Sequence, residues 1–211
     1  MTKKEKVNEL RKLLDIAYPE VKCSLNYSNP LEMLIATQLS AQCTDARVNI
    51  VTEQLFRRYR SVEDFANADL EELQEYIKSA GFYKNKSKNI IACCNRLIEA
   101  YNGEVPDTME DLLTLPGTGR KTANLVLGDI FSKPAIVVDT HCIRLSRRLG
   151  LTKEEDPTKI EMDLKKITPP DYSLRMCHQF VYHGRAVCTA RNPKCEICTV
   201  SHLCKYFKTK K

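Results

Sequence analysis

The sequence predicts an all-helical protein, and three observations support that prediction. Only 7 glycines and 9 prolines occur in 211 residues, so helices have few breaks. Apolar residues recur at the three- and four-residue spacing of a helix face, as at Val7, Leu10 and Leu14. The one strand-like run, residues 134–138, has no partner run elsewhere in the chain. We therefore expect it to be an extended, buried crossing between two helices.

Helix boundaries follow from capping and breaking residues. Pro30 suits the first turn of a helix, because that position needs no backbone N–H donor. Thr44 or Asp45 would cap the next helix, and Asp139 would cap a later one that Gly150 ends. Further helices are expected near residues 3–18, 69–80, 85–101, 107–114, 157–167 and 171–187, with one more directly after residue 119.

The charge of the chain favours a polyanionic partner only weakly. There are 33 Lys and Arg against 27 Asp and Glu, a formal net charge of +6. No apolar stretch follows the charged N-terminus, and no run approaches the ~18 apolar residues of a membrane span. We therefore expect a soluble, intracellular protein without a membrane segment.

A glycine turn, LPGTG at residues 115–119, separates two predicted helices. Gly117 and Gly119 permit positive φ angles and close approach of another group. The following helix begins with unpaired N–H groups and the positive end of its dipole. Such a helix–hairpin–helix turn binds a DNA phosphate without reading sequence. A nucleotide-binding P-loop is excluded, because it needs four residues between its glycines, whereas an ordinary turn between helices stays open.

Two candidate catalytic side chains follow from their positions. Lys121 lies on the first turn of the helix after the hairpin, where burial and the helix dipole would disfavour its charged form. A neutral amine there could attack a sugar C1′. Asp139 follows the apolar residues 136–138, so the chain would deliver it from the core to a helix N-terminus. A solvated lysine and a simple N-cap carboxylate are the alternatives.

Ten cysteines occur in the chain, and four of them crowd into the last 24 residues with the spacing C-x6-C-x2-C-x5-C. This crowding indicates a metal site. The spacing does not choose between zinc and a [4Fe–4S] cluster, since both accept four thiolates. Disulfides are the weaker third choice. The candidate ligands are Cys188, Cys195, Cys198 and Cys204, and the others, expected to be buried thiols, are Cys23, Cys43, Cys93, Cys94, Cys142 and Cys177.

Basic residues are interleaved with the four clustered cysteines. Arg185, Arg191 and Lys194 lie before or between the first two of them, and Lys205 follows the last. A loop held by metal would present these charges as a rigid surface for phosphate. We expect the basic tail, residues 205–211, to be frayed.

Four short segments follow one another in a fixed order: residues 40–45 (SAQCTD), 115–124 (LPGTGRKTAN), 138–141 (VDTH) and 183–185 (HGR), followed by the four clustered cysteines. Together they resemble the endonuclease III family of helix–hairpin–helix DNA glycosylases. The resemblance covers nearly the whole chain, and four ordered matches are far more specific than the hairpin alone.

The resemblance implies a role for each matched residue. Lys121 would be the nucleophile, and Asp139 would stabilise positive charge at the sugar and help proton transfer. Gln42 and Phe82 would fill the gap that a flipped-out base leaves. Phe82 stands where the family usually has leucine, and Thr118 replaces an apolar residue of the hairpin. DNA contacts would also come from Gly117, Gly119, Arg120, Arg185, Arg191 and Lys194, and the four clustered cysteines would hold a [4Fe–4S] cluster.

The resemblance also implies the reaction. The chain would remove oxidised pyrimidines from duplex DNA. It would then nick the strand 3′ of the abasic site by β-elimination, through a lysine Schiff base. Its partner would be double-stranded DNA that contains damaged pyrimidines or abasic sites. We expect a monomer in the cytoplasm, associated with the nucleoid.

Two helical domains on either side of a DNA-binding cleft are implied as well. A six-helix barrel with the helix–hairpin–helix would span residues 23–133. An iron–sulfur cluster domain would combine residues 1–22 with residues 134–211. Lys121 would then face Asp139 across the cleft.

Three other functions stay open at this point. A mismatch-specific glycosylase of the same superfamily would share the cluster, although adenine-mismatch relatives usually lack a lysine at the position of Lys121. A non-catalytic DNA-binding module would keep the hairpin and the basic loop without using Lys121 or Asp139. A zinc-stabilised or redox protein would use the cysteines alone.

Overall fold

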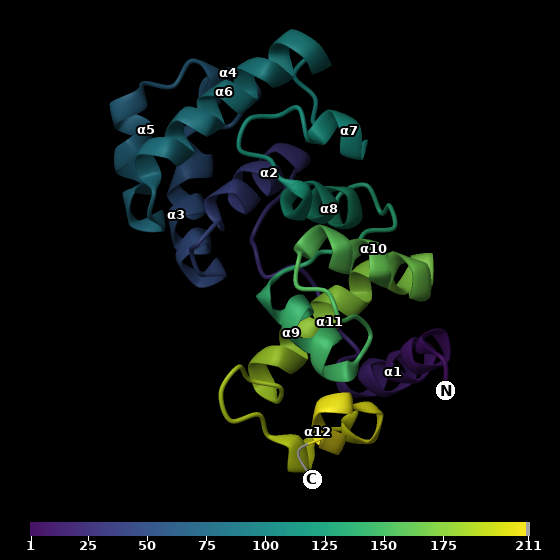
Figure 1. Cartoon of the computed structure of the whole chain (residues 1–211). Coiled ribbons are helices and arrows are strands. Elements are labelled where there is room, and N and C mark those ends of the chain that lie inside the picture. The colour runs from purple at the N-terminus through teal and green to yellow at the C-terminus, as the bar shows by residue number, and fades with distance from the viewer. Residues whose placement is uncertain (210–211) are drawn as a thin grey trace. The chain divides into compact units, whose positions relative to one another are not determined.

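A computed structural model of the chain describes residues 1–209. Within these residues every regular element is a helix, so the predicted all-helical class is confirmed (Figure 1). None of these helices combines the length and the apolar character that crossing a membrane requires. The chain forms two compact units. We call Cys23–Lys133 the central unit, and Met1–Lys22 together with Pro134–Lys211 the split unit.

The central unit is built around α2 (Pro30–Leu39). Residues 33–39 are all buried, because this helix is apolar on nearly every side and packs against α3 and α8. Pro30 opens α2, as predicted. The other elements are α3 (Asp45–Arg58), α4 (Val62–Ala66), α5 (Leu70–Ile77), η1 (Lys78–Ala80), α6 (Tyr83–Tyr101), α7 (Met109–Leu112) and α8 (Arg120–Asp129).

The short helix α4 was not predicted from the sequence. The Ser61 side chain accepts a hydrogen bond from the Asp64 amide, and the Asp64 carboxylate accepts one from the Ser61 amide. This reciprocal capping box starts the helix, and Val62 and Phe65 are buried against the unit. The Ser-x-x-Asp spacing was therefore a signal for a helix start at this point.

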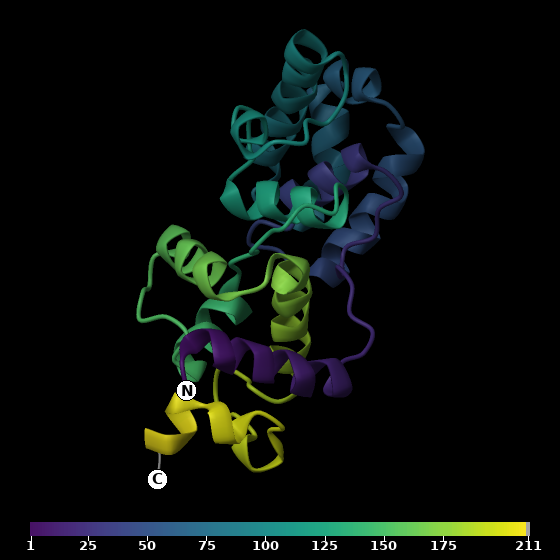
Figure 2. The ribbon, with the colours of Figure 1, turned by 90° about the vertical axis from the view of Figure 1, so that its right-hand side faces the viewer.

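The split unit joins the N-terminal helix to the C-terminal third of the chain (Figures 1 and 2). Helix α1 packs against α10, and α9 packs against α11 and α12. The expected fraying after Cys204 is wrong as far as Thr209, because a short helix forms there; residues 210–211 lie outside the described part. The elements are α1 (Lys3–Ala17), α9 (Thr140–Leu149), α10 (Pro157–Ile167), η2 (Pro170–Tyr172), α11 (Ser173–Ala186), η3 (Cys195–Ile197), η4 (Ser201–Leu203) and α12 (Lys205–Thr209).

The apolar run at residues 134–138 is a buried crossing and not a strand, as expected. Its amides find partners on α11. The Ala135 N–H donates to Ser173 Oγ over 3.1 Å, and the Val137 N–H donates to Cys177 Sγ over 3.3 Å. Side chains of α11 thus accept hydrogen bonds from the backbone N–H groups of this segment, which in a strand would pair with a neighbouring strand.

One buried lysine joins two loops of the central unit. Lys86, on α6, is 7% exposed, and its Nζ donates to Leu39 O over 2.8 Å and to Ala80 O over 3.0 Å. Burial lowers the pKa of Lys86. Within residues 1–209 it forms no ion pair with a carboxylate. The ammonium group therefore interacts with carbonyl dipoles at the end of α2 and at the end of η1.

The residues just beyond these two carbonyls have unusual backbones. Gln42 has a φ of 53° and Phe82 a φ of 50°. Such angles are uncommon for residues other than glycine, and a strained residue of this kind costs about 1–3 kcal/mol unless its surroundings hold it. Lys86 supplies part of that hold, because it fixes the chain two or three residues before each of them.

We expect Lys86→Met to lower the free energy of unfolding by about 1–3 kcal/mol, because two buried carbonyls lose their charged donor. Lys88→Met is the matched control, since Lys88 is exposed on the same helix and its replacement should stay within about 0.5 kcal/mol. Denaturant unfolding measures both variants. Hydrogen exchange at residues 40–43 and 81–83 should speed up in Lys86→Met alone. Equal stability of the two variants would contradict this role of Lys86.

Candidate functional site

The hairpin turn of the central unit is closed by contacts that require glycine at position 117. Gly117 has a φ of 76°, and a Cβ there would lie 3.0 Å from Asn89 Cβ and 3.1 Å from Gln38 Oε1. Gln38 Nε2 in turn donates to Pro116 O over 3.1 Å and to Thr118 Oγ1 over 3.3 Å. The buried side chain of Gln38, which belongs to α2, therefore holds the turn against that helix.

These contacts explain why threonine is tolerated at position 118. The Thr118 side chain is buried and its hydroxyl accepts the hydrogen bond from Gln38. It points into the central unit and not toward a ligand, so replacing an apolar residue by threonine leaves the outer face of the turn unchanged.

Gly119 is a different case. It is the N-cap of α8, with an extended backbone at φ −99°, so the expectation of positive φ holds for Gly117 alone. A Cβ on Gly119 would meet nothing within 4 Å, and no side chain caps the first turn of α8. No atom of residues 1–209 lies close enough to demand glycine here. The open space at a helix N-terminus suits an anion that approaches the backbone closely.

Lys121 lies on the first turn of α8 and its side chain is exposed. The expected burial of Lys121 is therefore wrong. The reason is its place at the start of α8: residues 122–128 are buried all round the helix, whereas Gly119 and Lys121 at its N-terminal end are exposed. The helix N-terminus beside it remains, and Arg120 lies half-buried on the same turn.

Asp139 is the N-cap of α9 in the split unit. Its Oδ1 accepts the Cys142 N–H over 2.7 Å, so the structural role that the sequence left open is present. The side chain is half-buried, and Oδ2 has no hydrogen-bond partner within residues 1–209. One oxygen therefore fixes the carboxylate, and the other is available for chemistry.

His141 packs against Gly184, where α9 meets α11. A Cβ on Gly184 would overlap His141 Nδ1 and would lie 2.9 Å from Arg144 Nη2. The Arg144 guanidinium in turn contacts His141 Nδ1 and donates to Gly184 O. The glycine of the HGR segment is thus a close-packing position, and His141 has the packing role that the sequence suggested.

Gln42 and Phe82 both project from the central unit. Phe82 is 63% exposed, and Gln42 is also exposed. The sequence analysis missed the residue that holds their loops, Lys86. A signal for it existed, because Lys86 lies on the apolar stripe of α6 that continues through Ile90 and Leu97. A lysine on such a stripe must find partners for its ammonium group inside the protein.

The four clustered cysteines of the split unit line one pocket. No set of three or more His, Cys, Asp or Glu side chains in the described part of the chain is arranged to hold a single metal ion. A zinc ion would need all four sulfurs about 2.3 Å from one point. Four thiols around a shared hollow could hold a polynuclear [4Fe–4S] cluster, and its candidate donors are Cys188, Cys195, Cys198 and Cys204.

Two arginines of α9 hold the loop that begins at Cys188. Arg148 Nη1 lies 3.2 Å from Cys188 Sγ and donates to Thr189 O over 2.8 Å. Arg148 Nη2 donates to Ala190 O over 2.9 Å, and Arg144 Nε donates to Cys188 O over 3.0 Å. These hydrogen bonds fix the loop that carries Cys188, so the two arginines hold its sulfur in position at the pocket.

The remaining cysteines only partly match the sequence prediction. Four of the six are buried, and burial raises the pKa of Cys93 to about 11, which makes it an inert thiol. A hydrogen bond with Cys177, followed by burial, raises the pKa of Cys142. Cys23 and Cys43 are half-buried, so the prediction of burial is wrong for these two.

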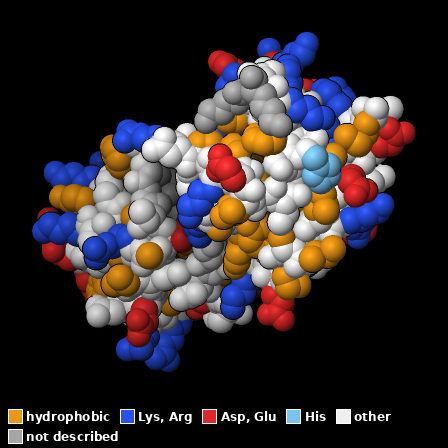
Figure 3. Space-filling model, turned by 90° about the horizontal axis from the view of Figure 1, so that it is seen from below, with side chains coloured by type: hydrophobic (Ala, Val, Ile, Leu, Met, Phe, Trp, Pro, Cys, Tyr) orange, Lys and Arg blue, Asp and Glu red, His pale blue; other side chains and the backbone are white. Residues whose placement is uncertain are grey.

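The basic residues predicted to contact DNA lie at the surface. Arg185, Arg191 and Lys194 are all exposed. Seen from below, Lys and Arg side chains form separate groups between hydrophobic and acidic ones (Figure 3). On this face the basic side chains therefore lie in separate patches and form no continuous basic surface.

Known proteins resemble this chain over nearly its whole length. Residues 35–170 match the HhH-GPD superfamily of base excision DNA repair proteins, and residues 188–204 match the iron–sulfur binding domain of endonuclease III. Endonuclease III from Synechocystis sp. is 51% identical over 205 residues, which cover 96% of this chain and 93% of that protein. Endonuclease III from Escherichia coli (strain K12) is 40% identical over 188 residues, 89% of each chain.

Solved structures agree with these relatives. A trapped endonuclease III–DNA covalent intermediate is 43% identical, with a TM-score of 0.93 over 100% of this chain and 99% of that one. A thermostable thymine-DNA glycosylase has a TM-score of 0.87 at 22% identity, over 97% and 98% of the two chains, and shares the fold. The mismatch-specific and non-catalytic alternatives are not favoured. The chain belongs to the endonuclease III family, carries a [4Fe–4S] cluster, binds DNA and is a DNA glycosylase and AP lyase of base excision repair.

Proposed function

We propose that this chain excises oxidised pyrimidines from duplex DNA and that Lys121 is the nucleophile. The observation that carries the proposal is the start of α8, where an open glycine N-cap lies two residues before an exposed lysine. The glycine and the first-turn amides grip a phosphate. The amine then lies within reach of the neighbouring sugar.

The reaction needs one amine and one carboxylate. Lys121 Nζ forms a bond to C1′ as the bond between C1′ and the damaged base breaks, and the base leaves with the electron pair and takes up a proton. Opening of the sugar gives a Schiff base, which acidifies the C2′ proton. Loss of that proton breaks the 3′ C–O bond by β-elimination and leaves a nick.

Asp139 acts at the same sugar in this proposal. Its Oδ1 is held by the Cys142 amide, so the carboxylate keeps one orientation. Its Oδ2 carries the negative charge that stabilises positive charge developing at C1′, and it accepts a proton as the amine adds.

Gln42 and Phe82 occupy the space of the everted nucleotide in this proposal. Their exposure and their left-handed backbones support it, because strain and exposed aromatic surface concentrate at functional sites. Phe82 inserts into the base stack and Gln42 hydrogen-bonds to the partner base that has lost its mate. Backbone phosphates bind at Gly117, Gly119, Arg120, Arg185, Arg191 and Lys194.

The cluster ligands are proposed to be Cys188, Cys195, Cys198 and Cys204, supported by their shared pocket and the arginines that hold its loop. The cluster supplies rigidity to the basic loop and takes no part in the steps above. We also propose that the chain works as a monomer on DNA of the nucleoid, in the cytoplasm.

Borohydride trapping tests the nucleophile. The unchanged chain should become covalently linked to duplex DNA with an abasic site, because borohydride reduces the Schiff base. Lys121→Ala should give no linked product, and its stability should stay within about 0.5 kcal/mol, since Lys121 is exposed. Lys88→Met serves as the exposed-lysine control and should be trapped normally. Trapping of Lys121→Ala at the normal level would remove Lys121 from this role.

The two hairpin glycines should respond in opposite ways. Gly117→Ala forces a side chain into a left-handed backbone and against Asn89, so the free energy of unfolding should fall by about 1–2 kcal/mol or more. Gly119→Ala should leave stability nearly unchanged but weaken DNA binding about tenfold, equal to ~1.4 kcal/mol, because its methyl group obstructs the phosphate. Thermal unfolding and fluorescence anisotropy measure the two quantities. Normal DNA affinity of Gly119→Ala would rule out the phosphate contact.

Replacing any one of the four proposed ligands by serine should reduce the amount of iron bound per chain and the visible absorption of the cluster. Iron–sulfur clusters need soft thiolate donors, which a hydroxyl does not replace. Cys43→Ser is the control, because Cys43 is half-buried in the central unit and should leave both signals intact. Full iron content in Cys198→Ser would exclude Cys198 as a ligand.

A further inference from the structure

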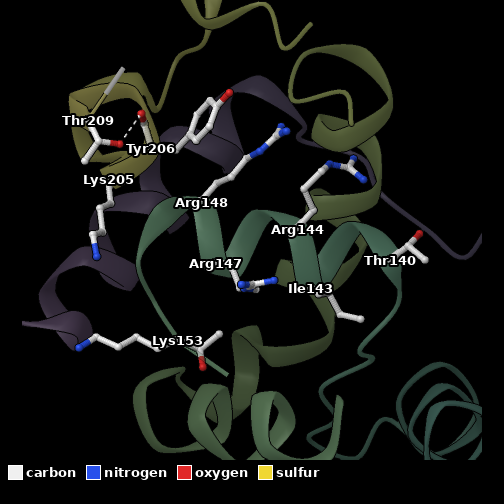
Figure 4. Close-up of a pocket in the computed structure, with 10 residues that line it drawn as sticks. Thr140, Ile143, Arg144, Arg147, Arg148, Lys153, Lys205, Tyr206 and Thr209 are labelled. Carbon is white, nitrogen blue, oxygen red and sulfur yellow. Dashed lines mark hydrogen bonds between the residues drawn. The ribbon is translucent and has the colours of Figure 1, made fainter. Parts of the chain in front are cut away.

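A hollow on the split unit, which we call the α9 pocket, is lined by five cationic side chains and by no acidic one in the described part of the chain. The cations come from α9, from the segment after it and from the start of α12 (Figure 4). Three threonine hydroxyls and Tyr206 also line it. The cationic residues are Arg144, Arg147, Arg148, Lys153 and Lys205.

These five cations are not equally available. Arg144 and Arg148 donate to the loop that begins at Cys188, and Arg147 pairs with Glu155 over 2.6 Å. Lys153 and Lys205 form no ion pair or hydrogen bond within residues 1–209. Figure 4 shows both lysine side chains on the same side of the pocket. The free charges are therefore two ammonium groups, which bind phosphate as point charges.

Positive charge around the pocket is only partly compensated, because Glu155 pairs with one of its five cations, Arg147. Burial lowers the pKa of Lys6, and the charges of Lys208 and Lys205 lower it further. Like charges held this close repel each other, and an anion in the pocket would relieve that repulsion. The five cations of the lining therefore favour a polyanion.

Two of the threonine hydroxyls already donate, Thr152 to Asp163 and Thr209 to a backbone carbonyl. Thr140 is the lining threonine whose hydroxyl has no such partner within residues 1–209, so it can donate to a phosphate oxygen.

The pocket offers little to a free nucleotide. Tyr206 is its one aromatic lining residue in the described part, and Arg148 covers that ring at 4.9 Å from the centroid. A base therefore has no open platform on which to stack. Helix α9 has ten residues and is about 15 Å long, which matches about four base-pair steps of ~3.4 Å. Its first residue, Thr140, lines the pocket directly after Asp139.

We infer that the α9 pocket is a second backbone site, which binds the phosphates of one DNA strand over about four nucleotides beyond the reacting one. Lys153 and Lys205 are its two main contacts. The inference rests on the DNA-binding activity of the chain, and its placement next to the reacting nucleotide rests on the proposed role of Asp139. It does not depend on Lys121, so trapping experiments on Lys121 can fail or succeed independently of it.

Salt dependence of binding tests this site. The probe is a duplex with a reduced abasic analogue, which cannot form a Schiff base, and its affinity is measured by anisotropy at several salt concentrations. Each lost phosphate contact lowers the slope of log K against log[salt] by about 0.9, so Lys153→Gln/Lys205→Gln should lower it by about 1.8. Glutamine keeps the aliphatic stem that Lys205 packs against Gly150.

The matched control is Lys12→Gln/Lys166→Gln, which removes the same charge from lysines that do not line the pocket. Its slope should stay at the value of the unchanged chain. Shortening the DNA on one side of the lesion to fewer than about four base pairs should weaken the unchanged chain but not the pocket variant. Equal slopes for both double variants would overturn the inference. It would also be overturned if inorganic triphosphate bound the pocket while the DNA slope stayed unchanged.

Discussion

The ammonium group of Lys86 is the contact on which the exposed end of the central unit depends. It donates to Leu39 O and Ala80 O, two carbonyls 41 residues apart in sequence, and it does so from a nearly buried position. Burying a cation without a carboxylate partner is unfavourable. In return, the hydrogen bonds of Lys86 attach two irregular loops to one rigid helix, α6. The left-handed Gln42 and Phe82 can then persist at the surface, where neither would hold its conformation alone.

The split unit uses the same device with arginine. Arg144 and Arg148 extend from α9, a regular helix, and donate to consecutive carbonyls of the loop that begins at Cys188. In both units a long cationic side chain on a helix fixes backbone that has no regular structure of its own. The choice of residue follows from geometry. Lys86 meets two carbonyls at one point, whereas Arg148 spreads its fork over two carbonyls and a sulfur.

Sequence reasoning succeeded where the signal is local. Periodicity predicted α1, α3 and α6. Residue type predicted that Thr44 and Asp139 cap α3 and α9. The spacing of the last four cysteines predicted that they lie together, and they line one pocket. It failed where the cause lies far along the chain. The partner of Lys86 on α2 is 47 residues away. The exposure of Lys121 depends on where along α8 the packing of the central unit begins, because residues 122–128 are all buried. A sequence motif shows which residues occur together, but it does not show how exposed their side chains are to solvent.

Gly119 shows how an absence of contacts can argue for a ligand. At Gly117 and Gly184 the chain itself fills the space where a side chain would be, so glycine there is explained by packing. At Gly119 the space is empty and the backbone is one that any residue adopts. Glycine is itself a favourable N-cap, and the empty space beside it leaves room for the phosphate contact that we propose. Lys121 beside it is exposed, so in the mechanism that we propose the bound DNA has to exclude water from the amine.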